Sequence, residues 1–158
     1  MAIVFYRIDE RAVHGQTVVS WSKVYPNDGI ILVSDYIANN KILREIYSKA
    51  TFDTKVHIFD TETALTKLIE AENSKRKYMV IVQEPITLWK IIKEKAIKPE
   101  KINVGPMTKR DGRRSVSMGV YMDDAEIEAC KNIIEQDISI EFQLLPGKEV
   151  RKFEDLKI

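Results

Sequence analysis

Short apolar runs alternate along the chain with stretches in which apolar residues recur at every third or fourth position. A run that is apolar at successive positions is typical of a strand buried on both faces of a parallel sheet, whereas the longer spacing is typical of a helix with one buried face. We predict strands at residues 3–6, 29–34, 56–59, 78–82, 102–104 and 138–144. The last run alternates apolar and polar positions, which indicates a strand at the sheet edge.

Predicted helices fill the intervals between these strands. Val18 and Trp21 recur at helical spacing after Gly15, and residues 37–50 carry one apolar stripe that predicts a single helix. Further helices are predicted from a cap at Asp60 or Thr61, from Pro85 to the group Lys95, Lys98 and Pro99, and from Asp123, with Glu126 at capping-box spacing, to about Gln136. The alternation with short connections predicts a single-domain α/β fold, an open, mostly parallel β-sheet with helices on both faces.

Three segments interrupt the alternation. Residues 105–114 combine glycine, proline and a dense charge cluster, which predicts an exposed loop. Residues 115–122 are predicted to be extended, and residues 150–156 are expected to form a short docking helix. Because the carboxyl ends of parallel strands meet at one edge of a sheet, the loop after residue 104 and the loop after the first strand can be neighbours.

Composition limits the possible functions. The 158 residues, 44% of them hydrophobic, are enough for one domain with a core. The 25 basic and 24 acidic residues give a net charge of +1, so no overall field attracts nucleic acid or an anionic membrane. The single cysteine, Cys130, rules out an internal disulfide, and its apolar helical setting predicts burial. With no secretion signal, lipidation motif or bilayer-spanning run, we expect a cytoplasmic protein without direct membrane insertion.

Candidate chemistry is concentrated where the first strand ends and the first helix begins. His14 lies at this junction, and a helix N-terminus offers unpaired backbone N–H groups and a partial positive charge that attract anions. Arg7 and Arg11 precede it, Asp9 lies between them, and Gly15 lets the backbone approach a ligand closely. This setting favours a histidine that carries a phosphoryl group; a polar helix-start residue without chemistry is the alternative.

Residues 7–16, followed by Trp21, resemble the phosphorylation-site loop of IIB components of the mannose/fructose/sorbose family of the bacterial phosphoenolpyruvate-dependent sugar phosphotransferase system (PTS). Residues 30–35 resemble the second strand of that family with its turn, residues 103–107 its mid-chain loop, and residues 115–127 its later strand and helix start. The resemblance therefore covers the chain, residues 1–158, as one PTS EIIB type domain. It departs at Ala12 and Val13, where bulkier apolar residues are expected, and at Pro106, where a small residue is more usual.

The resemblance implies that His14 accepts a phosphoryl group from the IIA component and passes it to a sugar held by the membrane-embedded IIC/IID permease. It implies no cofactor and no metal ion, points to Nδ1 as the accepting nitrogen, and includes a homodimer among the assemblies open to the chain. The expected phosphate-binding residues are Arg11, Arg7, Gly15 and Gln16, with Asp9 orienting an arginine or the imidazole. The expected partner-docking residues are Lys109, Arg110, Arg113 and Arg114.

Two other function classes stay open. The segment around His14 resembles the Arg-His-Gly motif of histidine phosphatases, but Val13 replaces the arginine and no histidine follows His57 to act as the second catalytic histidine. The other class is a non-catalytic module whose histidine is phosphorylated only as a signal. His57, in a strand pattern, and Trp21, on an apolar helix face, are predicted to be structural, and 2 histidines with 1 cysteine form no metal constellation.

Overall fold

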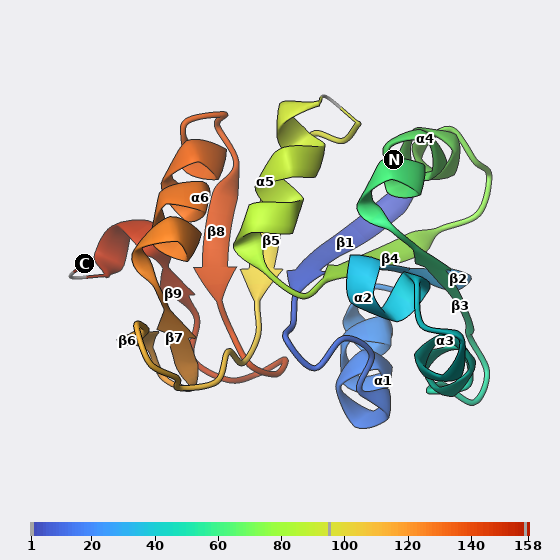
Figure 1. Ribbon diagram of the computed structural model, residues 1–158, viewed down its shortest axis with the longest axis horizontal. Coiled ribbons are helices and arrows are strands. Elements are labelled where there is room, and N and C mark those ends of the chain that lie inside the picture. The colour runs from blue at the N-terminus through green and yellow to red at the C-terminus, as the bar shows by residue number, and fades with distance from the viewer. Residues whose placement is uncertain (1, 95, 157) are drawn as a thin grey trace.

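A computed structural model of the chain describes residues 2–94, 96–156 and 158 (Figure 1). The strands are β1 (Ile3–Ile8), β2 (Gly29–Val33), β3 (Lys55–Phe59), β4 (Tyr78–Val82), β5 (Lys101–Val104), β6 (Arg114–Ser117), β7 (Val120–Met122), β8 (Ser139–Phe142) and β9 (Arg151–Lys152). The helices are α1 (Gly15–Val24), α2 (Asp35–Ala38), α3 (Lys41–Ser48), α4 (Thr61–Glu72), α5 (Pro85–Lys93) and α6 (Asp124–Ile134), and Phe153–Asp155 form a 3-10 turn. Lys95, expected near the end of α5, lies outside the described residues.

Seven strands form one open sheet in the order β3-β2-β4-β1-β5-β8-β9, and β6 pairs with β7 in a separate antiparallel hairpin. Neighbours in the large sheet are parallel except β8 and β9. The chain fills one side of β1 with β2, β3 and β4 and then crosses to the other side with β5 and β8. The carboxyl end of β1 therefore lies at a switch in strand order, where open α/β sheets usually bind ligands.

Helices cover both faces of the sheet, which confirms the predicted fold class. Helices α1 to α3 pack on one face, where Phe5, Val18 and Trp21 belong to one core cluster. Helices α4 to α6 pack on the other face, around a cluster that includes Leu68 and Ile91. Among the described residues, none of these helices has the length and apolar character needed to cross a membrane.

A bulge near the start of β1 decides which face its later residues meet. Ile3 belongs to the core under α4 to α6, and the pairing with β4 shifts register between Ile3 and Phe5. Phe5 therefore faces α1, where its ring stacks on Trp21 at a centroid distance of 4.7 Å. Because strand residues alternate, Arg7 also points to the α1 face, and its guanidinium carbon lies 5.4 Å from the Trp21 ring centroid.

Three predictions of secondary structure are wrong. Residues 37–50 form two helices, because the side chain of Asn40 caps the start of α3. Residues 115–122 form a hairpin instead of one extended segment, with a turn at Gly119, whose φ of 71° suits glycine. Residues 150–156 form β9 and the 3-10 turn instead of a helix, so β8 is an inner strand and β9 lies at the edge.

Candidate functional site

The loop from Asp9 to His14 connects the carboxyl end of β1 to α1. The backbone N–H of Asp9 bonds the carbonyl of Val82 on β4 at 2.8 Å, and that of Ala12 bonds back to Asp9 at 3.0 Å. Ala12 has a φ of 62°, an uncommon left-handed conformation for a residue with a side chain. Ala12 and Val13 are both buried in the core cluster on the α1 face, so this apolar pair anchors the loop.

His14 caps the start of α1 with extended backbone, and its side chain is exposed. Its carbonyl accepts the first helical hydrogen bond, from the N–H of Val18 at 3.0 Å. The N–H groups of the first turn, including those of Gly15 and Gln16, have no partner within the helix, and the helix dipole adds a partial positive charge. An exposed imidazole thus lies beside a set of backbone donors that suit an anion.

Asp9 fixes the position of Arg11. One carboxylate oxygen accepts hydrogen bonds from the backbone N–H and from Nε of Arg11 at 3.0 and 3.1 Å, and the other accepts from a terminal nitrogen at 3.0 Å. Asp9 is 1% exposed, whereas the Arg11 side chain is 40% exposed. A buried carboxylate therefore holds an accessible guanidinium in one orientation, and of the two partners expected for Asp9 the contacts favour the arginine.

Arg7 is buried beneath this loop, with a side chain that is 1% exposed. Its Nε donates to Asp9 at 3.1 Å, and one terminal nitrogen donates to the side chain of Asn103. The terminal nitrogens also donate to the carbonyls of Gln143 and Leu144, at 3.2 and 3.1 Å. Burial lowers the pKa of Arg7, and the Asp9 carboxylate opposes that shift. This placement corrects the expected phosphate contact of Arg7, because its donors hold Asp9, Asn103 on β5 and the loop after β8.

The loop after β5 lies against the loop after β1, as the parallel topology predicts. The N–H of Gly105 bonds the carbonyl of Ile8 at 2.7 Å, and Asn103 at the end of β5 contacts Arg7. A Cβ atom at Gly105 would collide with the Arg7 guanidinium. The close approach of this arginine therefore requires glycine at position 105.

Glu10 ties the site loop to the basic segment. Its carboxylate accepts hydrogen bonds from the N–H of Thr108 at 2.6 Å and from Arg113 at 3.1 and 3.2 Å, and lies 3.2 Å from Arg110. Arg113 also donates to Glu126 at 2.6 Å, and its side chain is only 2% exposed. Burial alone would lower the pKa of Arg113, but the carboxylates of Glu126 and Glu10 outweigh it and raise that pKa.

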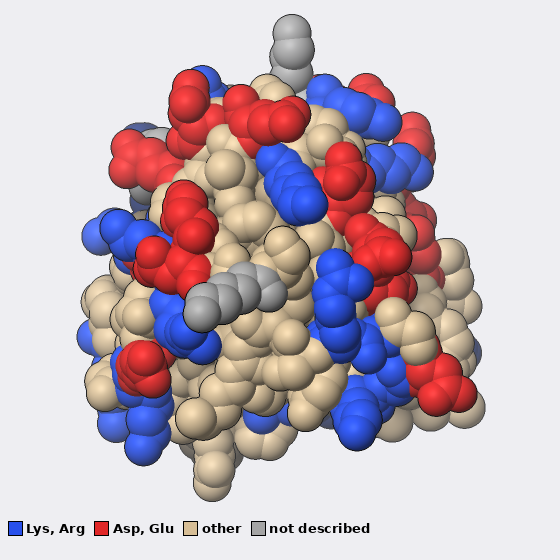
Figure 2. All heavy atoms as spheres, turned by 90° about the vertical axis from the view of Figure 1, so that its left-hand side faces the viewer, with Lys and Arg blue, Asp and Glu red and all other residues tan. Residues whose placement is uncertain are grey.

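The prediction that residues 105–114 form an exposed loop is thus wrong in part. Met107 is buried in the core, and the buried ion pairs of Arg113 withdraw its side chain from any partner. The basic residues that stay exposed are Lys109, Arg110 and Arg114. Figure 2 shows basic and acidic side chains interspersed over the end of the molecule that carries α6 and β9. The exposed cations of this segment therefore act locally and not as part of an extended positive face.

Sequence reasoning missed Thr17, Gln83 and Ser34. Thr17 is 5% exposed. Its Oγ1 atom accepts a hydrogen bond from Arg11 at 3.1 Å and lies 3.3 Å from Nδ1 of His14. Its spacing of three residues from His14 on a helix was the available signal. Gln83 donates to the carbonyl of Glu10 at 3.0 Å, and Ser34 donates to Gln83 at 2.6 Å. Both follow strand ends and line a cleft of about 340 Å³ beside Glu10.

The structural roles predicted for Trp21 and Cys130 are confirmed. Trp21 is 3% exposed and Cys130 is fully buried. Burial raises the pKa of the Cys130 thiol to about 12, so the reactive thiolate is scarce at neutral pH. Within the part of the chain that the structure describes, no group of three or more His, Cys, Asp and Glu side chains could hold a metal ion.

A protein-family model described as "PTS system sorbose subfamily IIB component" matches residues 3–157. The chain belongs to this family. Membership makes it the phosphocarrier subunit of a sugar phosphotransferase of the mannose family, whose other parts are a IIA component and a IIC/IID permease.

Relatives with different sugars resemble this IIB component to a similar degree. It is 27% identical over 155 residues to the N-acetylgalactosamine-specific phosphotransferase enzyme IIB component 1 of Escherichia coli K12, a match that covers 97% of each chain. It is 29% identical over 158 residues to the PTS system fructose-specific EIIB component of Bacillus subtilis 168, covering 97% of this chain and 94% of the relative. The crystal structure of the IIBSor domain of the sorbose permease from Klebsiella pneumoniae superposes with a TM-score of 0.90 at 22% identity, over 98% and 95% of the two chains. This last similarity confirms the fold.

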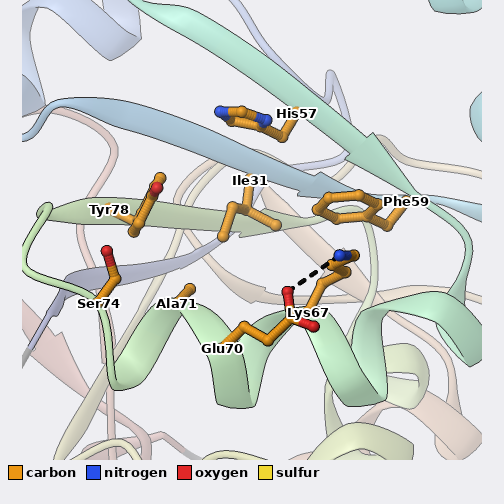
Figure 3. Close-up of a pocket in the computed structure, with 8 residues that line it drawn as sticks. All are labelled: Ile31, His57, Phe59, Lys67, Glu70, Ala71, Ser74 and Tyr78. Atoms are coloured by element: carbon orange, nitrogen blue, oxygen red, sulfur yellow. Dashed lines mark hydrogen bonds and ion pairs between the residues drawn. The ribbon is translucent and has the colours of Figure 1, made fainter.

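His57 of this IIB component lies on the sheet face opposite α1. Its β3 neighbours Val56 and Ile58 belong to the core on the α1 face, so the alternation of the strand places His57 on the α4 face. There it lines a pocket of about 410 Å³ with Phe59 and Tyr78, between the sheet and α4 (Figure 3). The sheet therefore separates the two histidines, which cannot form the paired-histidine site of a phosphatase.

Proposed function

We propose that His14 accepts a phosphoryl group from a phosphohistidine of the IIA component and donates it to a hexose or N-acetylhexosamine bound by the IIC/IID permease. The observation that carries this proposal is the exposed imidazole at the N-terminus of α1, beside an Arg11 guanidinium that Asp9 holds in place. Exposure allows two different partners to reach the same nitrogen in turn. Family membership supports the order of the two steps.

Each step is an in-line displacement at phosphorus. In loading, a lone pair of the His14 imidazole forms the new N–P bond while the P–N bond of the donor phosphohistidine breaks, and its electron pair returns to the donor imidazole. In discharge, a sugar hydroxyl oxygen forms the P–O bond, the His14 P–N bond breaks, and the hydroxyl proton leaves to solvent. Such transfers need placement and neutralisation of charge on three equatorial oxygens.

Arg11 and the backbone of the first turn of α1 supply that neutralisation. The guanidinium can offer planar pairs of N–H donors, and the N–H groups of Gly15 and Gln16 add fixed dipoles at no cost of reorganisation. As the family resemblance implies, the scheme uses no cofactor or metal ion. The carrier must also release the group, so an exposed and shallow anion site is better suited than a deep one.

Arg7 supports this arrangement from below. Its guanidinium is bonded to the Asp9 carboxylate that in turn holds Arg11, and it stacks over Trp21 in the core of the α1 face. We assign it to the positioning of Asp9 instead of to phosphate binding. The exposed basic residues Lys109, Arg110 and Arg114 are assigned to docking of the partners, because long exposed cations attract an acidic surface without a fixed geometry.

The test is phosphorylation in a reconstituted system. The protein is incubated with phosphoenolpyruvate, the general PTS proteins and the IIA component, and an acid-labile, base-stable phosphoprotein is expected. His14→Ala should take no label, while the matched control His57→Ala should be labelled normally. Label retained on His14→Ala would overturn the assignment. Transfer of the label to sugar in the presence of the permease distinguishes the carrier from a module phosphorylated only as a signal.

A further inference from the structure

The Thr17 hydroxyl connects Arg11 to the imidazole of His14. A terminal nitrogen of Arg11 donates to Thr17 Oγ1 at 3.1 Å, and the same oxygen lies 3.3 Å from Nδ1 of His14. Thr17 is 5% exposed and lies in the first turn of α1. The contacts form a continuous chain from the buried Asp9 to the exposed ring.

The chemistry of the donors fixes the direction of one of these two hydrogen bonds. A guanidinium can only donate, so Thr17 Oγ1 accepts from Arg11. The direction of the bond between Oγ1 and Nδ1 depends on the tautomer of His14, because the hydroxyl has one proton to donate and a second lone pair with which to accept. When the hydroxyl donates, Nδ1 presents a bare lone pair and the ring proton is on Nε2, which is the tautomer that phosphoryl transfer to Nδ1 requires.

We infer that Thr17 is a positioning residue for phosphoryl transfer: its hydroxyl, oriented by Arg11, holds His14 as the tautomer with a bare Nδ1 and then donates to the incoming phosphoryl group. This inference rests on the proposed function of His14. As Nδ1 forms the N–P bond, its lone pair is no longer an acceptor, and the exposed ring turns away from Thr17. The hydroxyl keeps its proton, still accepts from Arg11, and rotates to donate to a phosphoryl oxygen; the donor P–N bond breaks and its electron pair returns to the donor imidazole.

The kinetic test compares two substitutions at this position. Thr17→Val keeps the branched shape and removes the hydroxyl, whereas Thr17→Ser keeps the hydroxyl and removes a methyl group. Loss of a hydrogen bond to a charged phosphoryl oxygen should slow loading at saturating phosphorylated IIA by roughly ten- to a hundredfold in Thr17→Val. Thr17→Ser should stay within a few-fold of the wild type. The concentration of IIA that gives half the maximal rate should be the same in all three proteins, because Thr17 is only 5% exposed and offers little surface to a docked protein.

Nitrogen-15 NMR of the His14 ring tests the same bond without any partner. At pH 8, where an ordinary imidazole is neutral, the wild-type ring should be protonated on Nε2, with Nδ1 shifted as a hydrogen-bond acceptor. The Nδ1 shift should move toward that of a solvated imidazole in Thr17→Val and stay in Thr17→Ser. A wild-type ring protonated on Nδ1 would overturn the inference even if the valine variant did not fold.

The loading rates of the Thr17 variants can also overturn the inference. A Thr17→Val protein as fast as the wild type, or a Thr17→Ser protein as slow as Thr17→Val, would show that the hydroxyl has no part in transfer. Failure of the proposed function gives a different result, since the wild-type protein itself would then take no label from IIA. The NMR comparison would still decide the hydrogen bond in that case.

Discussion

A guanidinium can hold a carboxylate with one edge and still present donors to a second anion, and Arg11 is placed to do both. Its Nε and one terminal nitrogen bind Asp9, which is buried and therefore keeps a strong preference for its cationic partners. The Arg11 side chain is 40% exposed and lies beside His14, so its other terminal nitrogen is accessible to a second anion. A lysine has a single point charge and cannot divide its donors in this way.

Arg11→Lys should slow both loading from IIA and discharge to the permease. A lost transition-state contact of about 2–3 kcal/mol corresponds to a slowing of roughly thirty- to two-hundredfold in each step. The equilibrium level of phosphohistidine should change much less, because the contact is stronger in the transition state than in either end state. Rapid-quench measurement of both half-reactions shows whether Arg11 acts in the transition state or only binds the finished phosphohistidine. Unchanged rates with a shifted equilibrium would mean that Arg11 only binds the finished phosphohistidine.

Gly105→Ala should disturb the site through Arg7, which is buried beneath the loop that carries His14. The new Cβ atom would displace the Arg7 guanidinium and loosen its hold on Asp9, so we expect slower transfer and a free energy of unfolding lower by about 1–3 kcal/mol. Gly147→Ala is the matched control: its φ of 81° strains an alanine, yet no atom lies within 4 Å of the added Cβ. Urea unfolding and the loading rate are measured for both. If transfer slowed equally in the two variants, the collision with Arg7 would not be the cause of the slowing.

At the scale of elements, the segment between β5 and β6 combines a docking surface with a structural tie. Lys109, Arg110 and Arg114 are exposed, whereas Arg113 is buried between two carboxylates. Replacing the three exposed residues together by glutamine should slow loading from IIA at low salt and matter less at high salt, because exposed charges are screened. Stopped-flow or rapid-quench loading rates over a range of ionic strength measure this. Equal slowing at every ionic strength would place these residues in the transfer step itself.

Arg113→Gln is the contrasting variant of the same segment. It leaves Glu126, which is 3% exposed, with only the exposed Arg110 as a cation, at 4.0 Å, and removes two hydrogen bonds from Glu10. Truncating one partner of a buried ion pair typically costs about 3–5 kcal/mol, so the main result should be a lower free energy of unfolding at all salt concentrations. A stable protein with a salt-dependent loading rate would assign Arg113 to docking after all.

Short sequence patterns were enough to predict helices and strands, whereas contacts between residues far apart in the sequence could not be predicted from such patterns. The capping box of α6 was predicted from Asp123 and Glu126, which are three residues apart, and the structure has both of its hydrogen bonds. The second role of Glu126, as partner of Arg113, depends on folding of the hairpin between them. Likewise the first strand was predicted to cover residues 3–6, whereas β1 continues to Ile8, and Arg7 is buried there with partners that include Asn103 on β5 and the loop after β8, which are distant in sequence.

At the scale of the whole molecule, the sheet separates the two histidines: His14 is assigned to phosphoryl transfer, and His57 has a structural role. His57 lies on the α4 face, where its ring meets Tyr78 edge-on at a centroid distance of 6.1 Å. Burial, and then the charges of Lys55 and Arg76, lower its pKa from the ordinary 6.5. The folded protein therefore keeps this ring neutral at a pH at which the unfolded chain already takes up a proton.

Acid should thus destabilise the fold through His57. Since its folded pKa lies below the unfolded value near 6.5, the stabilising contribution of the neutral ring is complete above that pH and is lost as the pH falls through the folded pKa. Free energies of unfolding in urea, measured from pH 7.5 down to pH 5, should fall less steeply in His57→Gln than in the wild type. Lys55→Gln removes one of the two charges that lower the pKa, so its slope should be intermediate. Parallel slopes in all three proteins would mean that the acid sensitivity comes from other groups and that burial of His57 has no effect on its titration.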